Sequence, residues 1–182
     1  MVMTKLATAA DLAALPDDAF HRFELIRGEI RDVSPAGGDH GRIAGRTLKP
    51  LIALQDAGIG EVLVADTGYF LEYEPDTVLA PDVAFVLRED LRPLGEEKGF
   101  IRSVPTLVVE VVSPSESMRE VLEKVDIYRR AGVRLIWVAF PRTNTVLVDG
   151  AERERQTLGI DDVLDGGDVL PGLRLAVADI FR

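Results

Sequence analysis

The most informative residue in this sequence is Glu110, an acid standing alone among apolar residues in the run 107–112 (LVVEVV). Because burying an unpaired carboxylate costs several kcal/mol, a chain keeps one in such a run only with a partner, a raised pKa or a bound metal. Asp82 heads a second apolar run, 82–87, and Lys124 follows on a stretch with helical periodicity. Two strand carboxylates and a nearby lysine are the groups that metal-dependent hydrolysis of a phosphodiester requires.

Strand geometry decides whether the two acids can meet. Alternation along an extended strand puts Glu110 on one face together with Val108 and Val112. Pro81 cannot donate a ladder hydrogen bond, so it marks the start of the strand that begins at Asp82. If the two strands are neighbours, both carboxylates reach one cation. Magnesium takes oxygen ligands at about 2.0–2.1 Å and keeps several waters, one of which can become the nucleophile.

Lys124 lies on the flank of the apolar stripe of the helix expected at about 116–131. That stripe consists of Val121, Val125 and Tyr128. At about 100° per residue, Lys124 is about 60° from Val121 and about 40° from Tyr128 around the helix. Its stem can therefore follow apolar surface while its ammonium reaches the sheet. There the ammonium would stabilise charge on the phosphoryl group or orient the attacking water.

Each of these residues also has a purely structural interpretation. Aspartate after proline is common in turns, so Asp82 by itself does not indicate a site. Glu120 precedes Lys124 by four residues, the order that favours an exposed ion pair worth a few tenths of a kcal/mol. Glu110 is harder to explain in this way, because an exposed edge strand alternates apolar and polar residues.

Composition limits the class of protein. A chain of 182 residues, 47% hydrophobic and 29% charged, suits one globular domain over residues 1–182. The absence of cysteine excludes disulfides and thiolate sites, and two histidines argue against structural zinc. Magnesium or manganese, which prefer oxygen ligands, remain open. No apolar run is long enough to cross a membrane, and we expect a reducing, cytoplasmic location.

The charge balance bears on the partner. A formal net charge of −10 opposes nucleic-acid binding, for which a basic surface is expected. Net charge does not forbid a local basic patch, and both long helices carry basic residues that could form one. The alternative is that these are solvated helix faces. They are Arg42, Arg46, Lys49, Arg119, Lys124, Arg129 and Arg130.

The expected strands and helices are those of an α/β (α+β) protein. A β-hairpin comes first, with strands at 23–26 and 29–33 around an Arg-Gly turn. Further strands are expected at 61–66, 69–73, 82–87, 106–112, 134–139, 144–148, 155–158 and 173–175. Thr8 followed by Asp11 indicates the start of a short helix that includes 12–15, and a last helical turn is expected at 177–181.

Two longer helices separate these strands. The first begins near Asp39 and ends at Gly58, with Pro50 expected to kink or split it. The second covers about 116–131 and closes at Gly132, with serines 113, 115 and 117 forming a turn and a helix cap. Mixed strands around two substantial helices favour a single domain.

Several motifs together carry a resemblance to a known family. They are Pro81-Asp82, the block 105–115 (PTLVVEVVSPS), Lys124 with Tyr128, Gly132-Val133, Trp137-Val138, the segment 23–29 (FELIRGE), His40, and 170–174 (LPGLR). In these features the chain resembles the Uma-two family of restriction-endonuclease-like proteins. The resemblance covers nearly the whole chain. It implies the PD-(D/E)XK nuclease fold, a mixed β-sheet flanked by helices with an N-terminal β-hairpin.

The resemblance also implies roles for particular residues. Asp82 and Glu110 would be the metal-binding carboxylates. Glu24 would complete the catalytic and metal site, as a ligand or through water. His40, at the start of the first long helix, would contact substrate phosphate, or else have a structural role there.

The lysine departs from the general motif of the superfamily. That motif has a lysine two residues after the glutamate, where this chain has Val112. In the Uma-two pattern the lysine stands on the following helix, which is Lys124 here. Family members often carry an aspartate four residues before that lysine, and this chain has Glu120, one methylene longer.

The sequence thus leads to two hypotheses. The first is an endonuclease that depends on Mg²⁺ or Mn²⁺ and hydrolyses DNA with a metal-activated water. The second is a catalytically inactive, nuclease-like module that binds nucleic acid or protein, motivated by the acidic charge and by Val112. DNA is the expected partner of the enzyme. A homodimer is expected by analogy, because cutting a duplex requires cleavage of two strands.

Overall fold

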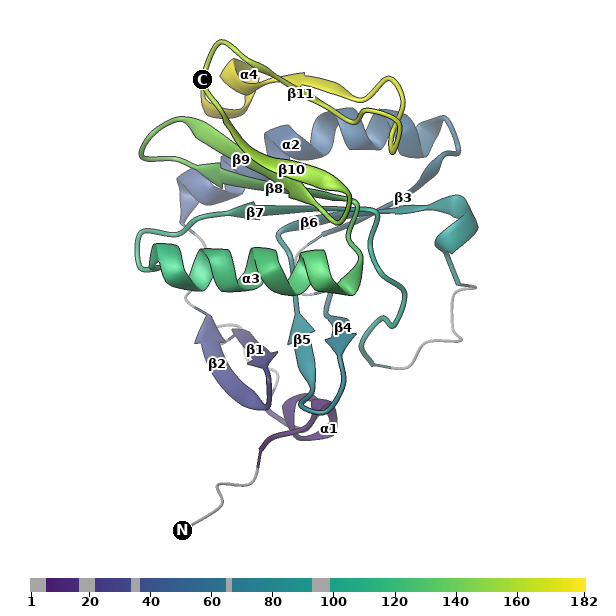
Figure 1. The fold of residues 1–182 in the computed structure, drawn as a ribbon, viewed down its shortest axis with the longest axis vertical. Coiled ribbons are helices and arrows are strands. Elements are labelled where there is room, and N and C mark those ends of the chain that lie inside the picture. The colour runs from purple at the N-terminus through teal and green to yellow at the C-terminus, as the bar shows by residue number, and fades with distance from the viewer. Residues whose placement is uncertain (1–5, 17–21, 34–36, 65–66, 93–98) are drawn as a thin grey trace.

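The computed structural model describes residues 6–16, 22–33, 37–64, 67–92 and 99–182. A six-stranded mixed sheet forms its centre, with the strand order β10-β9-β8-β7-β6-β3 (Figure 1). From one edge to the other these strands are β10 (Arg153–Leu158), β9 (Thr145–Gly150), β8 (Leu135–Phe140), β7 (Leu107–Val111), β6 (Val83–Leu87) and β3 (Gly60–Val64).

One helix covers each face of this sheet (Figure 1). Helix α2 (Gly38–Asp56) packs on one face, and α3 (Met118–Ala131) packs on the other. β7 and β8 are parallel and are joined through α3, whereas the other neighbouring pairs of the sheet are antiparallel. A parallel pair needs a crossover of this kind, usually a helix. The crossover places α3 directly over the face that carries Glu110.

A smaller antiparallel sheet lies on the far side of α3 from the central sheet (Figure 1). Its order is β2-β1-β5-β4, and its strands are β1 (Arg22–Ile26), β2 (Glu29–Val33), β4 (Tyr69–Glu72) and β5 (Thr77–Leu79). Ile26 and Leu79 of this sheet pack with the apolar stripe of α3. The short helix α1 (Ala9–Ala13) packs against the opposite side, through Leu12.

The C-terminal segment covers part of α2. It consists of the pair β11 (Val163–Asp165) and β12 (Arg174–Ala176), followed by α4 (Val177–Phe181), and it lies on the α2 side of the central sheet (Figure 1). A short 3₁₀ turn, η1 (Arg88–Asp90), follows β6.

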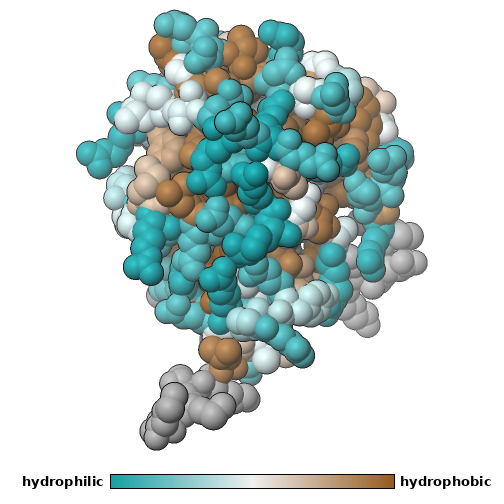
Figure 2. Space-filling view, in the orientation of Figure 1, coloured by the Kyte–Doolittle hydropathy of each residue, from teal (hydrophilic) through white to brown (hydrophobic). Residues whose placement is uncertain are grey.

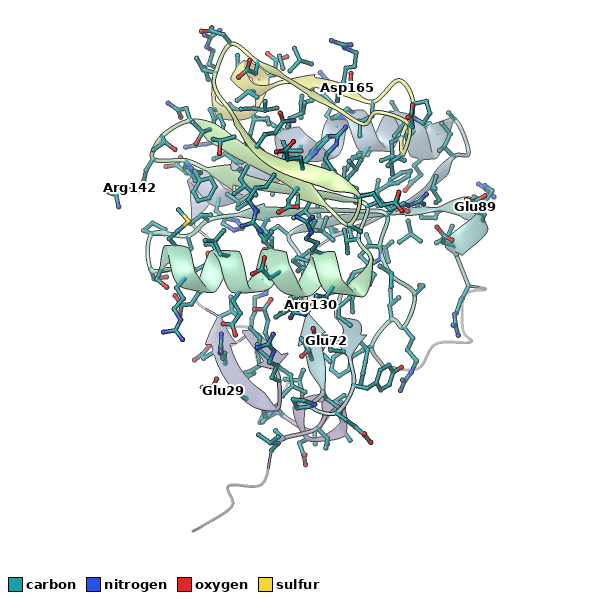
Figure 3. The ribbon with its side chains drawn as sticks, viewed as in Figure 1. Glu29, Glu72, Glu89, Arg130, Arg142 and Asp165 are labelled. Atoms are coloured by element: carbon teal, nitrogen blue, oxygen red, sulfur yellow. The ribbon has the colours of Figure 1, made fainter. Side chains whose placement is uncertain are left out.

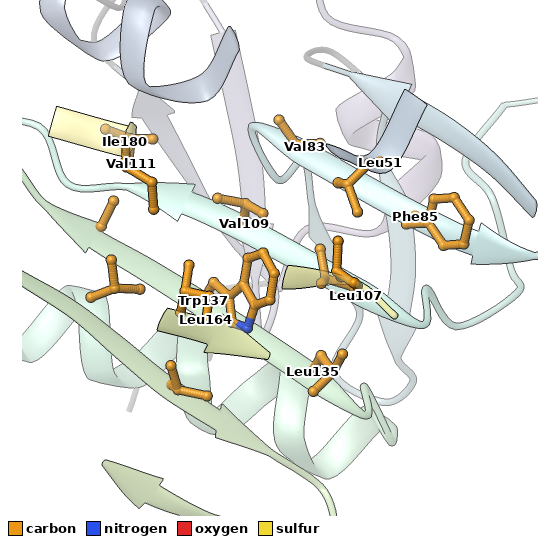
Figure 4. Close-up of a cluster of buried hydrophobic side chains, with 14 of the residues drawn as sticks. Leu51, Val83, Phe85, Leu107, Val109, Val111, Leu135, Trp137, Leu164 and Ile180 are labelled. Atoms are coloured by element: carbon orange, nitrogen blue, oxygen red, sulfur yellow. The ribbon is translucent and has the colours of Figure 1, made fainter. Parts of the chain in front are cut away.

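The largest core lies between the central sheet and α2 (Figure 4). Val109 and Val111 of β7 point into it, together with Trp137, which is 1% exposed. The intervening Glu110 therefore faces the opposite side, toward α3, as strand alternation requires. The outer surface is rich in hydrophilic side chains, with smaller apolar patches between them (Figure 2).

Most expected elements are present, with changes at their ends. The hairpin at 23–26 and 29–33 is confirmed; Leu25 pairs with Ile30, and both turn residues, Arg27 and Gly28, have positive φ angles of 50° and 78°. Such a two-residue turn matches the twist of its strands. α2 continues through Pro50, so the expectation that this proline would split the helix is wrong.

Other boundaries differ from the pattern-based expectations. The helix start expected at Thr8 and Asp11 is confirmed, because these two residues form a capping box and α1 begins at Ala9, but the helix ends at Ala13, before Leu15. β5 and β11 were not foreseen, since three residues carry too little periodicity to be recognised. Of the strand expected at 61–66, β3 accounts for the part up to Val64, and residues 65–66 lie outside the described ranges.

Over the described residues, we find no helix with both the length and the apolar character needed to span a membrane.

Candidate active site

The sheet register brings Asp82 and Glu110 together. β6 and β7 are antiparallel neighbours with Val83 opposite Val109, so continuing the register by one residue places Asp82 opposite Glu110. Residues directly opposite one another in an antiparallel pair share a face of the sheet. The Asp82 Oδ2 atom also accepts a hydrogen bond of 2.8 Å from the backbone N–H of Val111. Asp82 is therefore fixed to the strand that carries Glu110.

Glu110 lies in an environment that favours its protonated form. The hydroxyl of Tyr128 donates a hydrogen bond of 2.6 Å to Glu110 Oε1. Burial, with the negative charges of Asp82 and Glu24, raises the pKa of Glu110 to about 8, although the positive charge of Lys124 and the hydrogen bond from Tyr128 act in the other direction. A carboxyl held in this way gains stability from any cation that approaches it.

Lys124 reaches the same site from α3. Its Nζ lies 2.9 Å from Glu24 Oε2 and 3.6 Å from Glu116 Oε1, and only 12% of its side chain is exposed. Burial by itself would lower the pKa of Lys124, but the negative charges of Glu110, Glu24 and Glu116 raise it above its ordinary value. Lys124 is therefore a fixed positive charge inside a group of acids.

The alternative interpretation of Lys124, an exposed ion pair with Glu120, is wrong. Lys124 is largely buried and turned toward the small sheet. Glu120 instead completes the capping box at the start of α3, where its Oε2 accepts hydrogen bonds from the backbone N–H and the hydroxyl of Ser117. These bonds lower the pKa of Glu120. The expected cap at Ser117 is thereby confirmed.

Glu24 comes to the site from the small sheet. It lies on β1, it is 4% exposed, and its Oε1 accepts a hydrogen bond of 3.3 Å from the backbone N–H of Ala80. Its other oxygen holds Lys124. Glu24 thus joins the small sheet to α3 through a largely buried ion pair. Its expected role as a metal ligand stays a prediction.

His40 approaches from the opposite helix. It lies in the first turn of α2, and its Nε2 is 3.1 Å from Asp82 Oδ2. The hydrogen bond to Asp82 raises the pKa of His40 above 6.5, while partial burial acts in the other direction. His40 is thus part of the site, next to a candidate metal ligand. Contact with substrate phosphate stays a prediction.

Two participants were not identified from the sequence. Glu116, in the loop before α3, accepts a hydrogen bond of 2.8 Å from the backbone N–H of Ser113 and lies close to Lys124. In the sequence, Glu116 lies between the end of the strand with Glu110 and the helix cap at Ser117, and this position could have indicated that it belongs to the site. Tyr128 was recognised only as part of the apolar stripe and of the family resemblance. A buried tyrosine hydroxyl usually has a hydrogen-bond partner, so a tyrosine in the apolar stripe of a helix is itself a signal for a polar group nearby.

These side chains line one cavity of about 680 Å³. It is bounded by the end of the central sheet, by α3 and by the small sheet. Seven of its lining residues carry polar groups described above: Glu24, His40, Asp82, Glu110, Glu116, Glu120 and Lys124. The residues expected to form the site from sequence are therefore brought together.

The donor chemistry suits a hard divalent cation. Within the described parts of the chain, no three acidic or histidine side chains converge as a ready-made metal cluster, since Glu24 is paired with Lys124 and Asp82 with His40. Magnesium, however, is usually held by only one or two carboxylates and keeps several waters. Asp82 and Glu110, opposite one another on adjacent strands, supply such a pair. The residues present therefore fit Mg²⁺ or Mn²⁺.

Two comparisons with known proteins bear on the family and the fold of this chain. The family model described as "Uma2: Putative restriction endonuclease" matches residues 9–178. The chain belongs to the Uma2 family. This Uma2 member also superposes on a crystal structure described as "a putative nuclease belonging to DUF820 from Anabaena variabilis ATCC 29413", with a TM-score of 0.83 and 19% identity, covering 96% of this chain and 97% of that one. Among curated proteins, none matches the chain.

The two comparisons support different conclusions. At 19% identity the structural likeness shows the fold alone, and it confirms the restriction-endonuclease-like α+β architecture expected from the sequence. The family match extends over nearly all of this Uma2 chain and confirms the resemblance carried by its motifs. The family match indicates a nuclease-like protein with nucleic acid as its class of substrate.

Proposed function

We propose that this Uma2 protein is an endonuclease that hydrolyses DNA phosphodiester bonds and depends on Mg²⁺ or Mn²⁺. One observation carries the proposal: the register of β6 and β7, continued by one residue, places Asp82 just before β6 opposite Glu110, in the cavity that also holds the buried ammonium of Lys124. A pair of oxygen ligands beside a fixed positive charge suits an anionic phosphodiester, whose cleavage builds up further negative charge.

Each side chain has a distinct part in this mechanism. Asp82 and Glu110 would hold the cation, which when bound would acidify and position a water as the nucleophile. Lys124 would stabilise negative charge on the phosphoryl oxygens. Glu24 and Glu116 keep the ammonium of Lys124 in place.

The two remaining polar groups support the acids. Tyr128 orients Glu110 through its hydrogen bond. His40 would contact the phosphate from the Asp82 side, and as an imidazolium it would add to the positive charge that offsets the acids. A phosphodiester would then lie between two cationic side chains, His40 on α2 and Lys124 on α3.

A specific observation favours a second candidate, an inactive nuclease-like module that binds nucleic acid or protein. In this structure each of the acids Glu24 and Asp82 is paired with a cation of the protein itself, and the chain has a formal net charge of −10. Ion pairs within the site would be sufficient to stabilise a fold that no longer cleaves.

Cleavage of supercoiled plasmid distinguishes the two functions. The purified protein is incubated with plasmid and Mg²⁺, Mn²⁺ or a chelator, beside Asp82→Asn and Lys124→Ala. An exposed acid of η1 that does not line the cavity gives the matched control, Glu89→Gln. Metal-dependent nicking that is lost in both site variants and kept in the control supports the enzyme. Folded wild-type protein that cuts with neither metal contradicts it.

We further propose that the enzyme acts in the cytoplasm as a homodimer. The absence of cysteine supports a reducing compartment. The homodimer is proposed by analogy with other nucleases of this fold. The molecular mass in solution, measured by light scattering with and without DNA, tests the dimer; a monomer under both conditions would contradict it.

A further inference from the structure

The reactive groups lie inside the cavity and not on an open surface. The exposed fractions of the side chains are 6% for Glu24, 12% for Asp82 and for Lys124, and 16% for His40. A phosphodiester must therefore enter the cavity to touch them. The volume of about 680 Å³ falls in the range of pockets that enclose a small ligand. It suits one or two nucleotides.

Ion pairs fasten the small sheet to α3 across its width. At one edge strand, β2, Arg31 lies 2.8 Å from Glu123 of α3. At the other edge strand, β4, Glu72 lies 2.8 Å from Arg130 of α3 (Figure 3). Between them, Glu24 of β1 holds Lys124.

These pairs restrict what can enter. Each exposed pair contributes modestly, but separating the small sheet from α3 would break both of them and would also leave the buried charge of Glu24 or Lys124 unpaired. Such a buried charge is costly. The cavity therefore does not open readily for a wide ligand.

One wall of the cavity is apolar. It includes Leu12, Leu15, Val78 and Phe100. The ring of Phe100 packs against the backbone of Gly68, where an added Cβ would lie only 2.6 Å from the Phe100 Cδ1 atom. The glycine thus makes room for the aromatic ring at this wall. A flat aromatic surface in the same cavity as a phosphate site is suited to a stacked nucleobase.

The charges of the cavity do not match an extended duplex. Among the described lining residues, the cationic side chains are Arg22, Arg31, His40 and Lys124. Arg31, His40 and Lys124 each lie within ion-pair distance of an acid of the protein. Duplex binding rests on neutralising many phosphates with a basic surface. Single-strand binding relies in addition on stacking of bases against aromatic side chains.

We infer that this site takes an unpaired strand, with one nucleotide inside the cavity, its base against the Phe100 wall and its phosphate beside Lys124. The inference rests on the proposed nuclease activity and names its substrate class, a single strand or an unpaired flap. Because the reactive side chains are largely buried, bases inside a duplex cannot reach them unless they leave the stack.

Labelled oligonucleotides of one sequence test the inference. A single strand, a blunt duplex and a duplex carrying an unpaired flap are incubated with the wild type and Mn²⁺. The variants are Phe100→Leu, which removes the stacking ring, Phe100→Tyr, which keeps it, and the matched control Phe70→Leu. Phe70 belongs to the same apolar cluster but does not line the cavity. The melting temperatures of both leucine variants are measured to check that these variants are folded.

The expected result has two parts. First, the single strand and the flap are cut at least about tenfold faster than the duplex. Second, Phe100→Leu raises KM for the single strand about tenfold, whereas Phe100→Tyr and Phe70→Leu leave KM near the wild-type value. Equal or faster cutting of the duplex overturns the inference. So does a Phe100→Leu variant that behaves like Phe70→Leu.

Binding separates this inference from the proposed activity. The oligonucleotides are titrated by fluorescence anisotropy with Asp82→Asn in the presence of chelator, so that no cleavage is needed. If the wild type cuts nothing, the nuclease proposal fails. In that case, tighter binding of the single strand than of the duplex, weakened by Phe100→Leu, still supports a single strand as the ligand. Binding without that preference overturns the assigned ligand class as well.

Discussion

The hydroxyl of Tyr128 donates a hydrogen bond of 2.6 Å to Oε1 of Glu110, joining α3 to the strand that carries the candidate metal ligand. Tyr128 is fully buried, so its ring has one orientation available. The bond uses one of the two carboxylate oxygens of Glu110 and fixes the plane of the carboxyl group. A ligand fixed in this way presents the same geometry to every cation that binds.

Tyr128→Phe is therefore expected to weaken metal binding without changing the fold. Removal of the hydroxyl leaves the packing of the ring unchanged and costs about 1 kcal/mol of stability, while the concentration of Mn²⁺ needed for half-maximal cleavage rises about tenfold. Calorimetric titration with Mn²⁺ measures the effect directly. Tyr73→Phe removes a hydroxyl that bonds to Arg102 outside the cavity, and it is expected to leave metal affinity unchanged. Equal affinities in the two variants would contradict the assignment.

The titration of Glu110 is expected to make the metal-free protein less stable at high pH. Its pKa is about 8 in the folded protein, against an ordinary value of 4.5. The folded state therefore binds the proton more tightly, and this contribution is complete below pH 4.5 and is lost as the pH rises through 8. Urea unfolding in chelator at several pH values between these limits measures the slope.

Glu110→Gln provides the control for that slope. The amide does not titrate, so the difference in the free energy of unfolding between variant and wild type should grow in favour of the variant as the pH rises. Saturating Mg²⁺ should reduce the slope of the wild type, because the cation replaces the proton. A pH dependence that is identical in the two proteins would refute the raised pKa.

His40 is expected to titrate above its ordinary pKa of 6.5 because of its hydrogen bond to Asp82. A histidine with a raised pKa stabilises the fold below its unfolded pKa and loses that contribution as the pH rises through the folded value. With two histidines in the chain, the imidazole protons are readily followed by NMR. Asp82→Asn should move the midpoint of His40 down toward 6.5; an unchanged midpoint would show that Asp82 is not the cause.

Lys124→Met is expected to abolish cleavage and to destabilise the protein. Loss of the ammonium removes transition-state stabilisation worth about a hundredfold or more in rate. It also leaves Glu24 as an uncompensated buried acid, which costs about 3–5 kcal/mol. The double variant Glu24→Gln, Lys124→Met should recover much of the stability and none of the activity, as measured by thermal unfolding and plasmid nicking.

Glu120→Ala, which removes the accepting oxygen, distinguishes this buried pair from the helix cap next to it. Glu120 bonds to Ser117 at the start of α3, and its loss should cost about 1 kcal/mol while cleavage stays close to that of the wild type. Loss of cleavage comparable to that of Lys124→Met would instead place Glu120 in the chemistry.

The sequence by itself determined the elements and the most unusual residue. The isolated acid in 107–112 predicted a buried carboxylate because no exposed strand has that pattern, and the structure places Glu110 against Tyr128. The hairpin turn and the cap at Ser117 were also predictable, since both depend on residues a few positions apart. The motifs around Asp82 and Glu110 were sufficient to indicate the family.

Only the tertiary structure decided how the charges are paired. Glu24 and Asp82 were both expected near a metal, yet Glu24 holds Lys124 and Asp82 holds His40. Local spacing favoured Glu120 as the partner of Lys124, because residues four apart on a helix are neighbours. Burial decides against that spacing, because a lysine inside the protein needs an acid that is buried with it. The fold brings such an acid, Glu24, from a strand far away in the sequence.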